Sequence, residues 1–163
     1  MSENRWFRVG LPLLIAALAG WWVISGGRSS EEDAIRARLL EGKAAWEAKD
    51  LQRFMGFFAL SYQDRSGALN YGTLLEIHRG RLFSERCDLH ADIGDVKVKV
   101  AGTKATVTFD ATGSRTCGDG GPAYFVGQPA RPTPITLELE KSGAVTKEWK
   151  VVKSAGAANA DAF

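Results

Sequence analysis

The stretch that decides the fold is residues 86–100, RCDLHADIGDVKVKV, in which the alternation of apolar side chains slips by one position. Apolar residues occupy odd positions over 89–93 and even positions over 96–100. Side chains of a half-buried strand alternate with a period of two, so one extra residue at Gly94-Asp95 would return all of them to one face. The stretch therefore predicts a strand with a β-bulge, which bends and twists a sheet.

The bulge also sets the register of a hairpin. The turn AGTK at 101–104 leads into a second alternating stretch, ATVTFDATGSRT at 105–116. The apolar residues share one face when Val98 lies opposite Val107. Without a bulge, Cys87 would then lie opposite Gly118, whereas one extra residue at the slip places it opposite Cys117. The pattern predicts that the two cysteines of the chain are directly opposed.

Composition and charge narrow the class of protein. The 163 residues are 45% hydrophobic and 25% charged, which is typical of one folded domain. The 21 basic and 19 acidic residues are mixed along the chain and give a net charge of +2. No Lys/Arg cluster suits a phosphate backbone, so nucleic acid is not an expected partner.

The N-terminus suggests a membrane segment. Residues 9–27, VGLPLLIAALAGWWVISGG, carry no charge and would span about 28 Å as a helix, close to the thickness of a bilayer core. Arg5 and Arg8 lie in residues 1–8, before this run. The positive-inside rule then predicts a cytoplasmic n-region at 1–8, a single transmembrane anchor at 9–27 and a linker at 28–33, with the C-terminal domain on the periplasmic side of a bacterial inner membrane.

Two alternatives exist for this segment. The ALA triplet at 17–19, followed by Gly20, has the small-x-small form of a signal-peptidase site, so the segment could be a cleaved signal peptide. Cleavage would leave an apolar GWWVISGG stub, which favours the uncleaved anchor. A buried core helix is disfavoured, because it would be interrupted by Gly10, Pro12, Gly20, Gly26 and Gly27. Both the anchor and the signal peptide export the domain.

Export of the domain affects whether its two cysteines are oxidised or free. In an oxidising compartment, opposed strand cysteines are expected to form a disulfide, Cys87–Cys117, with two buried free thiols as the alternative. A zinc site is possible by residue count, because His78 and His90 complete a Cys2His2 set. Their spacing matches no familiar ligand pattern, so neither a metal nor another cofactor is expected.

The rest of the chain predicts an α+β domain at 34–153 and a flexible tail at 154–163. Three helices are expected: from a Ser30 cap to Lys49, over LQRFMGFF at 51–58, and over YGTLLEIHRGRLF at 71–83. A turn-rich connection is expected at 61–70. After the long hairpin, a Gly/Pro-rich loop at 117–134 precedes a second hairpin of ITLELEK and TKEWKVVKS. Such a domain packs its helices on one face of a curved antiparallel sheet.

Residues 44–67, AAWEAKDLQRFMGFFALSYQDRSG, resemble the NTF2-like superfamily, which includes SnoaL-like proteins and ketosteroid isomerase. The resemblance extends over about 31–153. It implies a cone in which helices and a curved sheet enclose a pocket, and it makes a homodimer through the sheet possible. Trp46, Phe58, Tyr62 and His78 are the residues expected to line that pocket. Each of them could equally be ordinary core.

The same resemblance allows a test for enolisation chemistry, which needs a base, an oxyanion-binding tyrosine and a protonated acid. In an alignment with the family, the base falls on or near Asp64, the tyrosine near Gly42 and the acid near Thr136. Only Asp64 has a suitable side chain, and in YQDRSG it has a plain use as a turn residue that accepts backbone hydrogen bonds. Asp64 is therefore the one candidate catalytic residue, with the structural role favoured.

These observations favour a non-catalytic function. We expect an accessory subunit or partner-binding module, held in the membrane beside a membrane-protein partner, since tethering raises local concentration. The alternative is an enzyme or carrier for a small hydrophobic molecule in the cone. A buried Asp64 directed into an open cavity would favour an enzyme.

Overall fold

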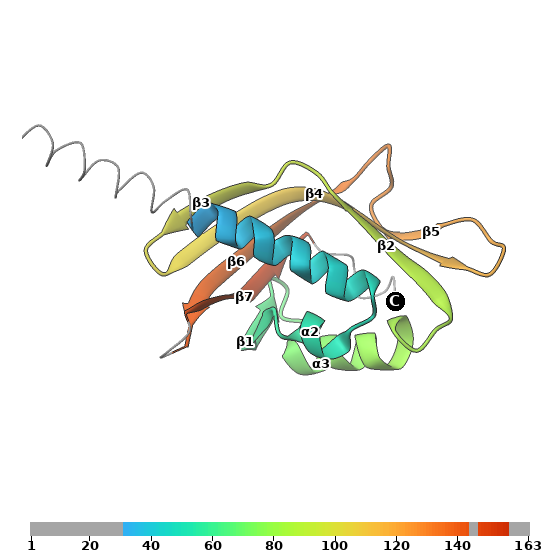
Figure 1. The fold of residues 1–163 in the computed structure, drawn as a ribbon, viewed down its shortest axis with the longest axis horizontal. Helices are drawn as coiled ribbons and strands as arrows, with labels where there is room; N and C mark the ends of the chain where they lie inside the picture. Colours follow the sequence, from blue (N-terminus) through green and yellow to red (C-terminus); the bar gives the residue numbers. More distant parts are fainter. Residues whose placement is uncertain (1–30, 144–146, 157–163) are drawn as a thin grey trace, which may run out of the picture.

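The computed structural model describes residues 31–143 and 147–156 (Figure 1). The expected n-region, the expected anchor at 9–27 and the Ser30 cap lie outside these residues. Over the part of the chain that is described, no helix is both long enough and apolar enough to cross a bilayer. Residues 31–33, expected to belong to a linker, are already helical.

The helices are short after the first. Residues 31–47 form a helix that buries Ile35 and leaves Leu40 exposed. Helix α2 (Leu51–Met55) begins at Asp50, whose side chain accepts from the Arg53 amide at 3.0 Å. It ends three residues earlier than expected. Helix α3 (Tyr71–Ile77) has an Asn70 and Thr73 capping box and continues into a π-helical turn, η1 (His78–Leu82).

The sheet contains seven strands in the order β1-β7-β6-β4-β2, with β3 and β5 also paired to β4. The strands are β1 (Phe58–Asp64), β2 (Cys87–Ile93), β3 (Lys97–Ala101), β4 (Lys104–Cys117), β5 (Ala123–Val126), β6 (Thr133–Ser142) and β7 (Glu148–Ala155). Figure 1 shows the sheet curling around the first helix, with α2 and α3 at its open side. This is the cone that the resemblance to the NTF2-like superfamily implied.

The predicted bulge and register are confirmed. Ile93 pairs with Ala111 and Lys97 pairs with Thr108, so three residues (94–96) stand against two (109–110) of β4. The Gly94 amide donates to the Asp110 carbonyl at 2.7 Å across this step. Beyond the bulge, Cys87 pairs with Cys117.

Three expectations were wrong. Residues 58–64 are not the end of a helix and a turn but strand β1, which runs parallel to β7, so the sheet is not wholly antiparallel. The loop expected at 117–134 contains β5, paired with β4. Ser154 and Ala155 belong to β7 rather than to a flexible tail. Strand β1 gains a hydrogen-bonding partner that lies far away in sequence, whereas β5 folds back on the strand directly before it.

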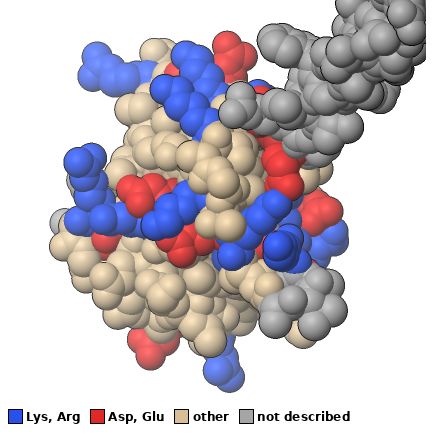
Figure 2. All heavy atoms as spheres, turned by 90° about the vertical axis from the view of Figure 1, so that its left-hand side faces the viewer, with Lys and Arg blue, Asp and Glu red and all other residues tan. Residues whose placement is uncertain are grey.

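The two faces of the sheet differ. The concave face carries the apolar core around Val107, whose side chain is 1% exposed. The convex face presents exposed polar residues such as Thr106, Thr108 and Glu138. Figure 2 shows basic and acidic side chains side by side over the end of the molecule where β3 joins β4. The Lys104–Glu140 ion pair, at 3.0 Å, is one such neighbouring pair of charges.

Candidate functional site

A cavity of about 270 Å³ lies inside the cone, between the helices and the concave face of the sheet. Its wall is mostly apolar. Typical contributors are Leu39 from the first helix, Phe54 from α2, Leu74 from α3, Ile93 from β2 and Phe109 from β4. The volume is just below the range of about 300–1,000 Å³ common for small-molecule sites. The cavity therefore suits a compact ligand.

Aromatic rings from α2 and β1 form one side of this wall. The Phe58 ring lies 5.2 Å from Phe54 and 4.9 Å from Tyr62, both in edge-to-face contact. Such contacts stabilise the rings against each other. Opposite them, the sheet contributes small residues, including Ala111 and Gly113. Large rings held together on one side and small residues on the other leave the space open.

The absence of a side chain at Gly113 has a second structural effect. A Cβ atom at this position would lie 3.2 Å from the Val126 Cβ. Gly113 pairs with Val126 of β5, at an irregularity in the β4–β5 ladder. The absent side chain lets β5 approach β4 closely and turn Phe125 and Val126 toward the cavity, which both residues line.

The structure places Trp46, Phe58, Tyr62 and His78 together on the cavity wall. The Trp46 indole nitrogen donates to Nε2 of His78 at 3.3 Å, and Nδ1 of His78 lies 2.8 Å from the Leu74 carbonyl. An indole N–H can only donate, so Nε2 accepts and Nδ1 carries the proton. Burial lowers the pKa of His78, against the Leu74 hydrogen bond, which acts to raise it. The imidazole is thus held neutral.

The Tyr62 hydroxyl also forms a hydrogen bond within the protein. It lies 2.7 Å from the Ser154 hydroxyl, and both residues are buried. Burial raises the pKa of Tyr62, so the phenol stays protonated near neutral pH. Because the neighbouring strand β7 supplies Ser154, this hydrogen bond also joins β1 to the interior of the sheet.

Lys43 is the cationic residue of the cavity wall, and its charge is already paired. Its Nζ lies 2.8 Å from Oε1 of Glu47, which also accepts from the Ala91 amide at 2.9 Å. Burial acts to raise the pKa of Glu47, but the Ala91 amide and Lys43 lower it overall. Glu47 does not line the cavity, and among the described residues that do, none is an aspartate or a glutamate.

Asp64 lies outside the cavity wall. Its Oδ1 accepts from the Leu69 amide at 2.9 Å and its Oδ2 accepts from the Ser66 hydroxyl. Burial acts to raise the pKa of Asp64, but these hydrogen bonds lower it overall. The carboxylate organises the 65–69 turn and does not point toward a reacting group. This is the structural role that the sequence favoured.

The other two positions tested for enolisation carry no matching group. A Cβ at Gly42 would lie 3.1 Å from the Phe57 ring, so any side chain there would have to displace that ring. Thr136 is absent from the cavity wall, which Ile135 and Leu137 line instead. None of the three tested positions thus brings its matching group to the cavity wall, and the phenol that the wall does hold, Tyr62, is paired with Ser154.

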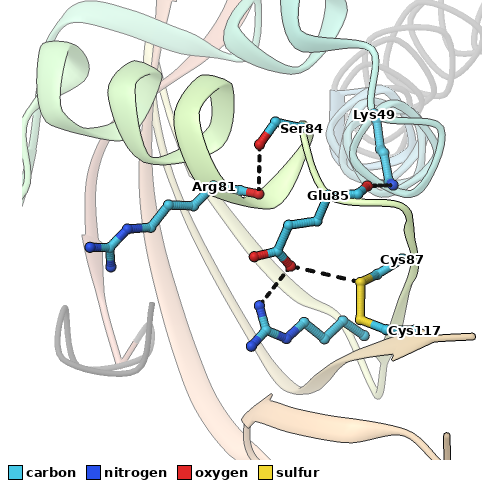
Figure 3. The surroundings of a disulfide bond; sticks show 7 residues. Lys49, Arg81, Ser84, Glu85, Cys87 and Cys117 are labelled. Carbon is cyan, nitrogen blue, oxygen red and sulfur yellow. Dashed lines mark hydrogen bonds and ion pairs between the residues drawn. A yellow bond between two sulfur atoms is a disulfide. The ribbon is translucent and has the colours of Figure 1, made fainter.

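The two cysteines form a disulfide at the open end of the β2–β4 ladder (Figure 3). Their Cα atoms are 4.2 Å apart. Glu85 lies beside the bond, and its Oε2 accepts from Nη1 of Arg115 at 2.8 Å. Glu85, Cys87 and Cys117 are close enough to surround a metal ion. However, the bonded sulfurs offer no thiolates, which are the ligand form of cysteine.

The histidines do not complete a zinc site with these cysteines. His78 lies in the cavity, whereas His90 is exposed on β2. Nδ1 of His90 lies 3.3 Å from Glu47, and its Nε2 lies 3.2 Å from Asp92. The Cys2His2 set that the residue count allows is therefore divided between separate places.

Sequence reasoning missed part of the wall. Phe57, Leu82, Phe125 and Val126 line the cavity but were not among the expected residues. For β5 a signal existed, because an aromatic and β-branched run, Tyr124 to Val126, stands between Gly/Pro-rich segments. No comparable signal identifies Leu82, whose orientation depends on the π-helical turn.

Comparisons with known proteins support the fold. No protein-family profile and no curated protein matches the chain. Among solved structures, a putative scytalone dehydratase from Novosphingobium aromaticivorans has a TM-score of 0.64 at 12% identity, over 80% of this chain and 85% of that one. An NTF2-like protein with a cystatin-like fold from the same organism has a TM-score of 0.60 at 16% identity, over 81% and 84%.

Bd1075 of Bdellovibrio bacteriovorus has a TM-score of 0.61 at 14% identity, over 83% of this chain but only 44% of that protein. This chain thus spans less than half of Bd1075. The NTF2-like neighbours show that the described domain has an NTF2-like fold. At these identities the likeness concerns the fold, and the fold includes both enzymes and binding modules.

Proposed function

We propose that this chain is a non-catalytic binding protein that takes up a small molecule with an apolar body in its cone. The observation that carries the proposal is an apolar cavity of about 270 Å³ whose wall has no carboxylate among the described residues. Binding such a ligand removes apolar surface from water, which is favourable at about 25 cal/mol per Å².

The state of the polar groups in the wall supports binding over catalysis. His78 is neutral and hydrogen-bonded at both ring nitrogens. Tyr62 is paired with Ser154, and Lys43 with Glu47. A general acid or base has to reach the proton it transfers and to change charge near the working pH. None of these groups meets both conditions.

For its cellular location, we propose that the chain is anchored in the membrane by the uncharged run at 9–27, with its C-terminal domain in the periplasm. The Cys87–Cys117 disulfide supports this proposal, because disulfides persist in oxidising compartments. A membrane-protein partner fits it, because tethering in one membrane raises the local concentration. A homodimer through the convex face is not part of the proposal. Its formation would remove polar residues such as Thr106, Thr108 and Glu138 from water without burying apolar surface, which is unfavourable.

The test is photo-crosslinking of the full chain in mild detergent with an uncharged phenyl diazirine, followed by peptide mapping. We expect labelling in peptides that contain Trp46, Phe58 or Phe125. Ala91→Phe, which fills the cavity from β2, should reduce this labelling strongly. The matched control is Ala44→Phe, the same change at an exposed position of the first helix.

Both variants are first checked for the intact disulfide and for unchanged helix and strand content. Labelling that maps elsewhere in the described domain contradicts a binding cavity. Labelling that maps to the cavity but is equally strong in Ala91→Phe contradicts it as well, because a filled space cannot hold the probe.

A further inference from the structure

Tyr62 and Ser154 place two buried hydroxyl groups side by side on the cavity wall, and we call them the hydroxyl pair. Tyr62 comes from β1 and Ser154 from β7, the strand that runs parallel to it. The two residues are only 3% and 4% exposed, and their hydroxyl oxygens lie 2.7 Å apart. The pairing of β1 with β7 therefore holds two hydroxyl groups together at one place in a mostly apolar wall.

The hydroxyl pair has one hydrogen more than its own hydrogen bond uses. A phenol and a serine hydroxyl each carry one hydrogen, and either oxygen can accept. Whichever of the two donates, the hydroxyl that accepts keeps its own hydrogen. Over the described part of the chain, neither side chain has a second hydrogen-bond partner. Because a donor buried without an acceptor is unfavourable, this hydrogen is suited to an acceptor that enters the cavity.

The other polar hydrogens of the wall are used within the protein or can reach water. The indole N–H of Trp46 and the Nδ1–H of His78 both donate to protein acceptors. Lys43 donates to both carboxylate oxygens of Glu47, and its side chain is 25% exposed, so water can accept its third hydrogen. The Thr112 hydroxyl lies 3.5 Å from a carboxylate oxygen on β2. The hydroxyl pair differs from these groups because it is buried and still has a hydrogen to donate.

We infer that the ligand carries an uncharged carbonyl group on its apolar body, and that the carbonyl oxygen accepts the remaining hydrogen of the hydroxyl pair. This inference rests on the proposed function, because the apolar body is what the cavity binds. A carbonyl oxygen has lone pairs and no hydrogen, so it complements a donor. An anion fits less well, since Glu47 already offsets the charge of Lys43 and an unpaired buried charge is costly. The hydroxyl pair lies at none of the three positions tested for enolisation, and it binds the carbonyl without proton transfer.

The experiment is competition against cavity labelling by the phenyl diazirine, on the full chain in mild detergent. The competitors are the ketone benzylacetone and the alkene in which a methylene group replaces its carbonyl oxygen. The two molecules share their shape and differ in the acceptor. For each protein we take the ratio of the concentrations that halve cavity labelling. Comparing this ratio between proteins removes the effect of different partition into detergent.

The decisive variant is the double change Tyr62→Phe, Ser154→Ala, because either hydroxyl alone would still carry a hydrogen. The matched control is Tyr71→Phe, Ser142→Ala, the same two changes at residues that do not line the cavity. We expect the change in the hydroxyl pair to weaken the ketone about tenfold relative to the alkene, as for the loss of one hydrogen bond. The control should keep the ratio of wild type. Lys43→Met tests the alternative donor of the wall.

A second measurement leaves the hydroxyl pair intact. The C=O stretching frequency of a ketone falls when its oxygen accepts a hydrogen bond. Infrared spectra are taken of benzylacetone, isotope-labelled at the carbonyl carbon, with the wild-type chain and with Ala91→Phe. Because the filled cavity excludes the ketone, the difference between the two spectra gives the band of the ketone in the cavity. We expect this band below the frequency of the same ketone in hexane.

Three results would overturn the inference and leave the apolar binding function standing. If the cavity is labelled and the double variant keeps the ratio of wild type, the hydroxyl pair does not bind the acceptor. If only Lys43→Met changes the ratio, the acceptor lies at Lys43. If the bound ketone absorbs at its hexane frequency, its oxygen accepts no hydrogen bond, and this result holds even where the double variant does not fold. If the wild-type cavity is not labelled at all, the proposed function fails and this inference fails with it.

Discussion

The indole N–H of Trp46 donates to Nε2 of His78 over 3.3 Å, and both side chains line the cavity. This hydrogen bond requires an unprotonated Nε2. Protonation of His78 would replace the acceptor with a second donor aimed at Trp46. The wall of the cavity is therefore built around a neutral histidine.

The first prediction concerns pH. Burial lowers the pKa of His78 below its ordinary value of 6.5. Below about pH 6.5 the unfolded chain binds a proton that the native state does not bind, so the stability is complete above that pH and falls as the pH drops toward the lower native pKa. We expect the free energy of unfolding to decrease between about pH 7.5 and 5.5 in wild type, and to decrease less in His78→Gln.

Urea unfolding followed by circular dichroism measures this difference. The matched control is His90→Gln, because His90 is exposed on β2 outside the cavity. The carboxylates with lowered pKa, Glu31, Glu47 and Asp64, titrate below this pH window and do not interfere. If His78→Gln keeps the full pH dependence of wild type, the neutral histidine is not its cause.

The second prediction concerns the bulge. Insertion of one alanine after Asp95 adds a residue that the bulge does not absorb, so the register of β2 with β4 would shift by one and bring Cys87 opposite Gly118. We expect free thiols in this variant. Alkylation without reductant, followed by mass spectrometry, detects them. Asp95→Ala keeps the chain length and should keep the disulfide, and an intact disulfide in the insertion variant would mean that the bulge does not set the register.

The third prediction concerns the contribution of the disulfide to stability. The bond joins residues with a sequence separation of 30. Closing a loop of this size restricts the unfolded chain and contributes about 2–4 kcal/mol. We expect the double variant Cys87→Ala, Cys117→Ala to lose about this much in urea unfolding. Reductant should destabilise wild type to a similar degree and leave the double variant unchanged; wild type that is insensitive to reductant would show that the bond adds no stability.

The fourth prediction concerns Asp64. Asp64→Asn weakens the hydrogen bonds to Leu69 and Ser66, so we expect a loss of about 0.5–1.5 kcal/mol in unfolding free energy. The contribution of the carboxylate should be present above its ordinary pKa of 3.8 and should be lost as the pH falls through its lower native pKa. Cavity labelling should be unchanged. Loss of labelling with unchanged stability would assign Asp64 to the binding site.

The long hairpin could be predicted in detail because its information is local. Apolar alternation fixes which side chains share a face, and a turn at 101–104 fixes where the chain reverses. Together they located the bulge and the opposed cysteines. Trp46 and His78 were also within reach, because their spacing places them on helical faces that turn toward the sheet, whereas Phe58 and Tyr62 reach the cavity from strand β1.

Strand β1 could not be assigned in this way, although Phe58, Leu60 and Tyr62 alternate. Its partner is the distant, parallel strand β7, and pairing of this kind leaves no local turn signal. Leu60 is 84% exposed, so the alternation does not report burial there. A second hollow, of about 360 Å³, was equally hidden, because it unites residues of η1, β4 and β5 only after the π-helical turn and the β5 pairing have formed.

Strand β4 presents its side chains to two different surroundings. Over its 14 residues, Phe109, Ala111 and Gly113 line the cavity and Arg115 lines a second hollow beside it, while Thr106 and Thr108 face solvent on the other side. Four neighbouring strands pair with it and hold its backbone in place. Divergence of ligand preference among descendants of such a chain could therefore proceed by single replacements at alternate positions of one strand, without altering the surface that the protein shows to its surroundings.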